Sequence, residues 1–284
     1  MATDTPTRPA RSDRAGVLPR RQGLAVTSWV LRQQRRAVVG WSIALAAVCA
    51  IYVGFYPAIG DQDMAQLIEG MPEGLVQALG YEGIDTAPGY LESTIFSLLG
   101  PALLLVFAIG FGARVLAGEE EDGKLELELT LPVDRRRVLL ERFLAMVVQL
   151  LVLAGVMVVT VVSMVLALDM DVMVSNIVAG TLGLLLFVLA MGTVSLGAGA
   201  STGRKAIGLA AGAGLAVASF MADALAPLIE GGGWLENASP FAWYLGGEPL
   251  TEGVHWAGFG GLVAITAVTL AVALPVFARR DLGV

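Results

Sequence analysis

Six long apolar runs, separated by more polar connections, form the dominant pattern of this sequence. Each run reaches the roughly 20 residues that a helix needs to cross the hydrocarbon layer of a membrane. We place the predicted spans at Ala37–Tyr56, Thr94–Val115, Leu144–Leu168, Asn176–Ala198, Ala206–Leu225 and Trp256–Phe277. The pattern predicts an all-α polytopic membrane protein with six transmembrane helices, and a single six-span domain over residues 23–284.

Positive charge is confined to alternate connections of this predicted bundle. All 18 Lys and Arg residues lie before the first span, around the second-to-third connection, between the fourth and fifth spans, or after the sixth. Cytoplasmic loops of membrane proteins carry the excess of Lys and Arg. Both termini and the second-to-third connection are therefore predicted to be cytoplasmic. The composition agrees, since only 15% of the residues are charged, against the roughly 25% of soluble domains.

The chain before the first span has two parts. Residues 1–22 are rich in Arg, Pro and Thr and predict a disordered cytoplasmic leader, because they offer little apolar surface to bury. From Gly23 to Arg36, apolar residues alternate with amide and basic ones, which is typical of an amphipathic helix lying in the headgroup plane. A solvated flank of the first span is the alternative.

The second-to-third connection, Gly118 to Phe143, holds the densest charge of both signs. It begins G-E-E-E-D-G-K, which matches the first seven positions of a phosphate-binding loop. Four carboxylates at the variable positions would repel phosphate, however, and Leu125 replaces the Ser or Thr that binds magnesium. A predicted span, rather than a buried strand, precedes the motif. We therefore expect no nucleotide site here.

The same stretch resembles the cytoplasmic loop after the second span of type-2 ABC exporter permeases. In that family the loop forms a coupling helix that docks on a separate ATPase subunit. The resemblance implies an ATPase-coupling role for Gly118, Glu119, Glu120, Glu121, Asp122, Gly123, Leu125, Leu127, Leu129, Pro132 and Arg135. Residues 125–131 alternate as a strand would, but Leu and Glu favour helix and no partner strand is evident, so we expect a helix.

Two further stretches bear on the same resemblance, and two positions depart from it. The ending Phe277–Leu282 is similar to that of the family, and the Arg-rich start with Gly40-Trp41 is similar to actinobacterial antibiotic-export members. Lys124 stands where Thr is common in the family, and Glu128 interrupts a segment that is usually apolar.

The fifth span is rich in small residues, including Gly208 and Gly212 four positions apart. This spacing lets two helix backbones approach closely. In the family the corresponding region helps to form the homodimer seam, so the resemblance implies that role here. Packing inside one subunit is the alternative.

The connection between the fifth and sixth spans mixes aromatic residues with Gly and Pro. Such a composition is typical of an interfacial or partly re-entrant segment. It also resembles the external re-entrant helices of the family, through Ser239, Pro240, Phe241, Trp243 and Tyr244.

The sequence contains no catalytic constellation. It has one His and one Cys, no metal-ligand spacing, and no basic-aromatic pattern for nucleic acid. The resemblance implies a non-enzymatic permease subunit of an ATP-driven exporter in the cell membrane, without a cofactor of its own. ATP and Mg would be bound by two copies of an ABC ATPase, and a second permease copy or a similar permease would complete the assembly within the lipid bilayer.

The composition of the spans bears on what is transported. Their polar residues are scattered Ser and Thr, which could not replace the hydration shell of an ion. We therefore expect an amphipathic or hydrophobic substrate: a drug, an antibiotic or a lipid-like molecule. An ion- or proton-coupled secondary transporter is the main alternative, but that class carries ionisable groups at mid-membrane. Asp223, the carboxylate nearest to a span core, is expected near the outer boundary. A structural or regulatory membrane protein is the third interpretation.

Overall fold

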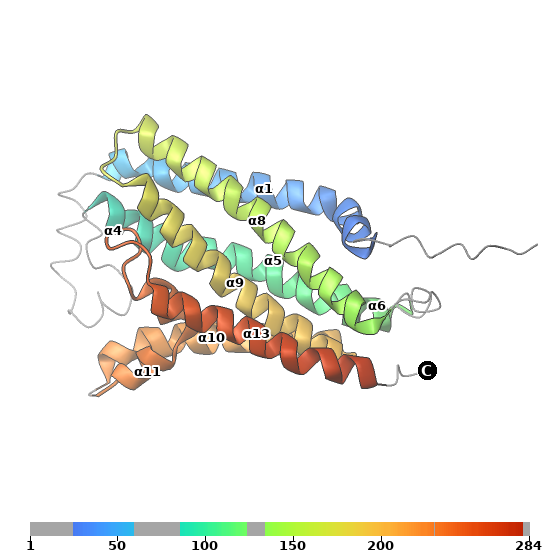
Figure 1. The fold of residues 1–284 in the computed structure, drawn as a ribbon. Helices are drawn as coiled ribbons and strands as arrows, with labels where there is room; N and C mark the ends of the chain where they lie inside the picture. The colour runs from blue at the N-terminus through green and yellow to red at the C-terminus, as the bar shows by residue number, and fades with distance from the viewer. Residues whose placement is uncertain (1–24, 60–85, 124–133, 230, 281–284) are drawn as a thin grey trace, which may run out of the picture.

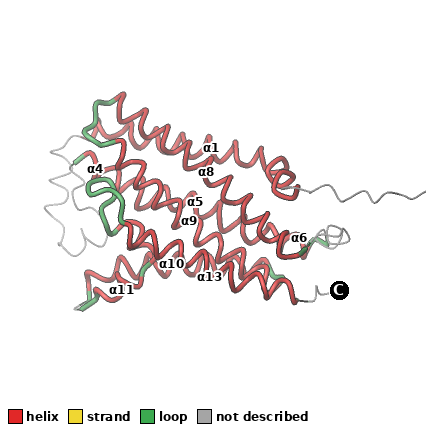
Figure 2. The backbone as a smooth tube through the Cα atoms, viewed as in Figure 1, coloured by secondary structure: helices red, strands yellow, loops and turns green. Residues whose placement is uncertain are grey.

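The computed structural model describes residues 25–59, 86–123, 134–229 and 231–280 (Figure 1). Every regular element within these ranges is helical (Figure 2). The predicted leader, residues 1–22, lies outside the described ranges. So do four of the predicted coupling residues: Leu125, Leu127, Leu129 and Pro132.

Six helical segments in the described residues are long and apolar enough to cross a membrane, which confirms the predicted number of spans. The second segment, Ala87–Glu121, consists of five consecutive elements, whereas each of the others is built on one long helix. Those long helices are α1 (Ala25–Ile59), α8 (Arg135–Ala167), α9 (Val174–Thr202), α10 (Lys205–Leu225) and α13 (Trp256–Arg279).

The second span contains two π-helical segments. It runs through α4 (Ala87–Leu91), a π-helix η1 (Glu92–Leu99), α5 (Gly100–Ala113), a second π-helix η2 (Arg114–Gly118) and α6 (Glu119–Glu121). The first π-segment ends at the Gly100-Pro101 pair, where Pro lacks the N–H of the regular hydrogen-bond ladder. π-segments within α-helices often mark functional positions.

Helix α9 lies at the centre of the bundle and packs against α5, α8, α10 and α13. Helix α1 packs mainly on α8, so α1 and α8 lie on one side of α9, and α10 and α13 on the other (Figure 1). The α5–α9 contact depends on glycine. A Cβ added at Gly112 would lie 2.4 Å from the carbonyl oxygen of Gly192, so any side chain there would push the two helices apart.

Two glycines of the fifth span, Gly208 and Gly212, also face inward. A Cβ at Gly208 would lie 2.8 Å from the carbonyl oxygen of Ser195 in α9, and one at Gly212 would lie 2.9 Å from the Ser195 Cβ. The close approach that their spacing predicts therefore takes place within one chain. The homodimer seam stays a prediction. In the structure, both glycines are in contact with α9 of the same chain.

The connection between α10 and α13 folds back onto the bundle as the short helices η3 (Ala226–Leu228), α11 (Gly233–Ala238) and α12 (Pro240–Leu245). The Ser239 hydroxyl donates to the carbonyl of Ser219 in α10 (2.7 Å) and accepts from Ala242 N–H (3.2 Å), capping α12. The Tyr244 hydroxyl, fully buried, donates to the carbonyl of Phe96 in η1 (2.7 Å). Short helices thus occur where a re-entrant segment is predicted; its depth in the membrane stays a prediction.

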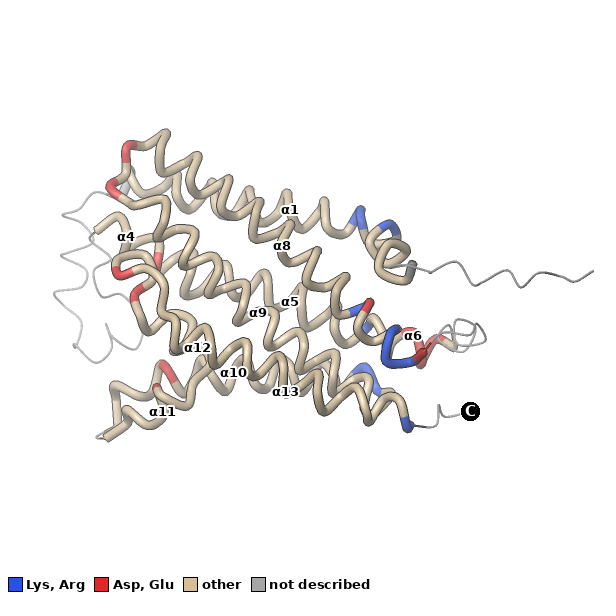
Figure 3. The backbone as a smooth tube through the Cα atoms, viewed as in Figure 1, with Lys and Arg blue, Asp and Glu red and all other residues tan. Residues whose placement is uncertain are grey.

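Charge separates along the long axis of the bundle (Figure 3). The Lys and Arg residues of the described ranges gather at the end that holds α6, the start of α8 and the end of α13, whereas the opposite end carries carboxylates only. This separation agrees with the predicted distribution of Lys and Arg over alternate connections. The assignment of the basic end to the cytoplasm stays a prediction.

Candidate functional site

Three consecutive carboxylates of α6 contact three different parts of the chain. Glu119 accepts a hydrogen bond from the guanidinium of Arg142 in α8. Glu120 accepts one from the guanidinium of Arg280, which follows α13. Glu121 accepts the backbone N–H of Lys205, the first residue of α10, at 2.8 Å. Successive residues of a helix point about 100° apart, so one short turn connects α8, α10 and the end of α13.

The contact with α8 is the most buried of the three. Arg142 has a fully buried side chain, the largest one in the described residues, and Glu119 exposes 19% of its side chain. Arg142 also donates to the backbone carbonyl of Val115 in η2. A buried cation is stable only with a well-placed anion and further hydrogen bonds, and here both come from the segment that ends in α6.

A second pair of contacts joins α6, α8 and the end of α13. Arg135, at the start of α8, donates to the backbone carbonyl of Arg280 at 2.5 Å, while the Arg280 guanidinium binds Glu120. Gly203, which ends α9 at φ +70°, packs against this pair: a Cβ there would lie 2.5 Å from Nη1 of Arg280 and 2.8 Å from Oε1 of Glu120. The α9–α10 turn therefore closes over the ion pair.

Glu141 connects the start of α1 to the same end of α8. Its carboxylate accepts the backbone N–H groups of Val26 (2.9 Å) and Thr27 (3.1 Å) and pairs with Arg137 one turn earlier (2.7 Å). The first N–H groups of a helix have no partner inside the helix, and a carboxylate satisfies them while favouring the positive end of the helix dipole. Residues 25–36, predicted as a separate amphipathic helix, are helical and continuous with the first span; their place in the headgroup plane stays a prediction.

The structure thus brings part of the predicted coupling residues together. Gly118–Glu121 continue the second span, Asp122 and Gly123 form the turn after it, and Arg135 lies beside Arg280. The sequence analysis did not predict the internal contacts of Arg142 and Glu141, because both residues belong to the charged second-to-third connection. The four-residue spacing of Arg137 and Glu141 is a local sign of their ion pair. Val26 and Glu119, the other partners, are distant in sequence from the residues that they contact.

An apolar groove of about 580 Å³ lies between α5 and α10, beside this charged end. Its walls are formed by aliphatic side chains, among them Leu105, Ile109, Leu209 and Val217, and its charged lining residues are Arg114 and Lys205. The same two cations also line a smaller cavity of about 420 Å³ that reaches α1, Glu119 and Glu121. The groove is therefore apolar along its length and basic at one end.

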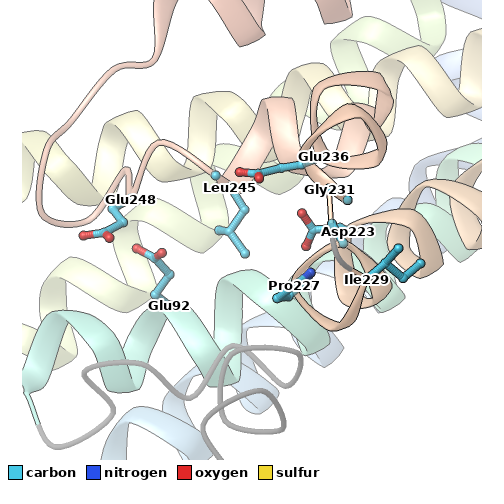
Figure 4. A pocket seen from close by; sticks show the side chains of 12 residues that line it. Glu92, Asp223, Pro227, Ile229, Gly231, Glu236, Leu245 and Glu248 are labelled. Atoms are coloured by element: carbon cyan, nitrogen blue, oxygen red, sulfur yellow. The ribbon is translucent and has the colours of Figure 1, made fainter.

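The opposite end of the bundle holds an acidic pocket of about 590 Å³ between the second span and the α10–α13 connection. In Figure 4, Glu92 and Glu248 lie close together, and Asp223 lies near Glu236. None of the described residues that line this pocket is Lys or Arg. Nowhere in the described ranges do three or more His, Cys, Asp or Glu side chains come together in a way that could hold a metal ion.

Comparison with known proteins adds one finding. The sequence pattern of the family described as "ABC-2 family transporter protein" matches residues 30–282. The match covers the bundle from α1 to the end of α13, including α6 and the connection that holds α11 and α12. No curated protein matches the chain.

Proposed function

Because this chain belongs to the ABC-2 transporter family and is a membrane permease component of an ABC transporter, we propose that it is the permease of an exporter in which α6 transmits the movement of the ATPase. It is a multi-pass membrane protein, which in bacteria means the plasma membrane, and it works with an ABC ATPase. Such a permease needs a mechanical connection between the surface that meets the ATPase and the spans that enclose the substrate.

The observation that carries the proposal is the three-way contact of α6. A force applied to the Gly118–Gly123 turn by an ATPase subunit would reach α8 through Arg142, α13 through Arg280, and α10 through the N–H of Lys205. The apolar groove lies between α5, which leads into α6, and α10, which begins at Lys205. Movement of α6 relative to α10 would therefore change the width of the groove.

The composition of the groove supports an amphipathic or hydrophobic substrate, such as a drug, an antibiotic or a lipid-like molecule. Its volume falls within the roughly 300–1,000 Å³ of ligand-binding clefts, and its walls are aliphatic. An ion would lose its hydration shell against such walls without replacement. The charged residues of the described ranges lie toward the two ends of the bundle (Figure 3), which speaks against an ion- or proton-coupled secondary transporter.

The assembly that we propose contains two permease copies, identical or similar, and two copies of the ATPase, which would bind ATP and Mg. The permease itself would bind no cofactor and catalyse no reaction. Helix α10 leaves an apolar face exposed beyond the groove, including Met221 and Leu225, and this face would meet the second permease. Gly208 and Gly212 would support the seam from within, by holding α10 against α9.

The coupling role is tested by charge reversal and charge exchange at one ion pair. Glu120→Arg should preserve membrane insertion and association with the ATPase but abolish the stimulation of ATP hydrolysis by hydrophobic compounds, because it repels Arg280. The double variant Glu120→Arg/Arg280→Glu restores an attractive pair and should recover much of that stimulation. Glu252→Arg, an equivalent charge change at the far end of the bundle, serves as the control.

Two outcomes of that experiment would contradict the proposal. One is normal stimulation in Glu120→Arg, which would mean that the pair transmits nothing. The other is a double variant no better coupled than the single variants. ATP-driven efflux of sodium or potassium from proteoliposomes would refute the substrate class while leaving the coupling role intact.

The orientation of the chain has its own test. A cysteine placed at Gly233, the first residue of α11, where an added Cβ meets no atom within 4 Å, should react with a membrane-impermeant thiol reagent added to intact cells, after Cys49 is replaced by Ala. A cysteine placed at Asp122 should react only after permeabilisation. The reverse pattern would overturn the assignment of the basic end to the cytoplasm.

A further inference from the structure

Arg114 and Lys205 stand at the boundary between an apolar and a polar space. Both line the groove between α5 and α10, and both line the cavity that continues toward Gln33, Gln34 and Glu119. Among the described residues, no carboxylate lines the groove itself. The adjoining cavity is lined by three carboxylates: Glu119 is paired with Arg142, Glu121 accepts the backbone N–H of Lys205, and Asp122 lies in the turn after α6.

The Arg114 side chain turns toward the groove instead of extending away from the span. An arginine at the end of a span normally extends its head toward water. Here Nε donates to the carbonyl of Gly110 at 2.8 Å, one turn closer to the middle of the span. The guanidinium also lies over Gly110, where an added Cβ would be 3.3 Å from Nη2. Because Gly110 itself lines the groove, its missing side chain makes room for the charged head.

We propose that this groove binds an amphiphile with an anionic headgroup, such as a phosphate monoester, taken from the inner leaflet. The headgroup would lie between Arg114 and Lys205, and the apolar chain would lie along the aliphatic residues of α5 and α10. The planar guanidinium presents several N–H donors in a geometry that suits a phosphate or carboxylate. This inference rests on the proposed function and names the substrate class of the same groove.

The far end of the bundle supports the same assignment. The acidic pocket there presents Glu92, Asp223, Glu236 and Glu248 without any basic lining residue. An anionic headgroup would be attracted at the basic end and repelled at the acidic end, because like charges in partly buried surroundings interact unfavourably. The charge separation of the bundle would thus favour loading at the basic end and release at the other.

A simpler explanation is that Arg114 and Lys205 only fix the orientation of the spans in the membrane. The two explanations differ in one respect: headgroup binding depends on the position of the Arg114 guanidinium, whereas orientation depends only on its charge. Gly110→Ala keeps every charge in the chain but places a methyl group against the position that Nη2 now occupies. A role in orientation alone would not respond to that change, whereas headgroup binding would.

The experiment measures lipid selectivity on the purified permease in a neutral detergent. The probes are fluorescent phosphatidic acid and fluorescent phosphatidylcholine with identical acyl chains, followed by fluorescence anisotropy. We expect the wild-type chain to prefer phosphatidic acid by about tenfold or more, the effect of one or two charge-assisted hydrogen bonds. Arg114→Gln and Lys205→Gln should each reduce this preference severalfold, and Gly110→Ala should reduce it without loss of charge.

The matched control is Arg204→Gln, which removes a positive charge adjacent to Lys205 from a residue that lines neither cavity. It should leave the preference unchanged. Equal binding of the two lipids by the wild-type chain would overturn the inference, and so would an equal loss in Arg204→Gln and Arg114→Gln, which would indicate bulk electrostatics. Inorganic phosphate should compete only weakly, since it lacks the apolar chain; displacement at concentrations comparable to those of the lipid would contradict an amphiphile site.

The two levels of the proposal can fail separately. Lipid selectivity is measured without the ATPase, so a permease that binds phosphatidic acid selectively but never assembles with an ATPase would refute only the coupling role. Conversely, a complex whose ATP hydrolysis is stimulated equally by phosphatidic acid in the wild type and in Arg114→Gln would refute the anionic headgroup and leave the exporter assignment standing.

Discussion

Replacing Glu119 by Gln should destabilise the permease more than replacing its partner Arg142 by Met. Glu119→Gln removes the Glu119 carboxylate charge from beside the guanidinium of a fully buried arginine, whereas Arg142→Met removes the buried charge itself and fills most of the same volume. In Arg142→Met, the carboxylate of Glu119 keeps access to water, since 19% of the Glu119 side chain is exposed. Loss of the Glu119 charge therefore leaves a buried cation, whereas loss of the Arg142 charge leaves a carboxylate that water can reach.

The magnitudes depend on the burial of each partner. Removing one partner of a buried pair typically costs about 3–5 kcal/mol of unfolding free energy, and the partial exposure of Glu119 places Glu119→Gln near the lower figure, at about 3 kcal/mol. We expect about 1 kcal/mol for Arg142→Met, because an apolar replacement of similar volume is close to neutral. The double variant should resemble Arg142→Met, so the two losses do not add.

The assay is thermal unfolding of the purified permease in detergent, compared among the four proteins at one scan rate. A change of 1 kcal/mol corresponds to roughly 2 °C in a chain of this size. We therefore expect the midpoint to fall by about 6 °C in Glu119→Gln, and by about 2 °C in Arg142→Met and in the double variant. An Arg142→Met midpoint as low as that of Glu119→Gln, or additive losses in the double variant, would refute the reasoning.

Three further substitutions test other contacts of the bundle. Gly203→Ala should lower the thermal midpoint by several degrees and weaken coupling, because its Cβ would meet Arg280 and Glu120. The control is Gly123→Ala, which has the same φ of +70° but lies in open space. It should lower the free energy of unfolding by only about 1 kcal/mol. Glu141→Gln should cost about 1 kcal/mol by weakening the cap of α1, measured as faster proteolysis near the start of that helix. Gly112→Ala should reduce the yield of folded protein, since its Cβ would lie 2.4 Å from a carbonyl oxygen of α9, and an unchanged yield would show that α5 and α9 can separate without cost.

The spans could be predicted from the sequence because their signal is local. A run of about 20 apolar residues must satisfy its own backbone hydrogen bonds in the hydrocarbon layer, and only a helix or a closed barrel does so. The short helices between α10 and α13 have local signals as well, since Ser is a preferred N-cap residue and Pro is preferred at the first helical position, as in Ser239-Pro240. Each of these elements is specified by neighbouring residues.

The contacts of the candidate site could not be predicted in the same way. The charge run 118–142 gives no local sign that Arg142 is buried while Arg136 is exposed; that difference arises when α8 packs beside η2. Glu141 and Val26 are 115 positions apart, and only the packing of α1 on α8 brings them together. The spacing of Gly208 and Gly212 correctly indicated a close helix contact, but it did not identify α9 as the partner.

The three contacts of α6 differ in strength, and that difference bears on how the proposed exporter would move. The Glu119–Arg142 pair is buried on the arginine side, whereas Glu120 and Arg280 each expose about one-sixth of their side chains, 14% and 17%. An ion pair that is partly exposed on both sides costs less to break than one whose cation is fully buried. Helix α6 would therefore move together with α8 as one body, and the contacts with α13 and α10 would open and close during the transport cycle. Since the groove lies between α5 and α10, the contact of Glu121 with the first N–H of α10 is the one whose opening would widen the substrate path.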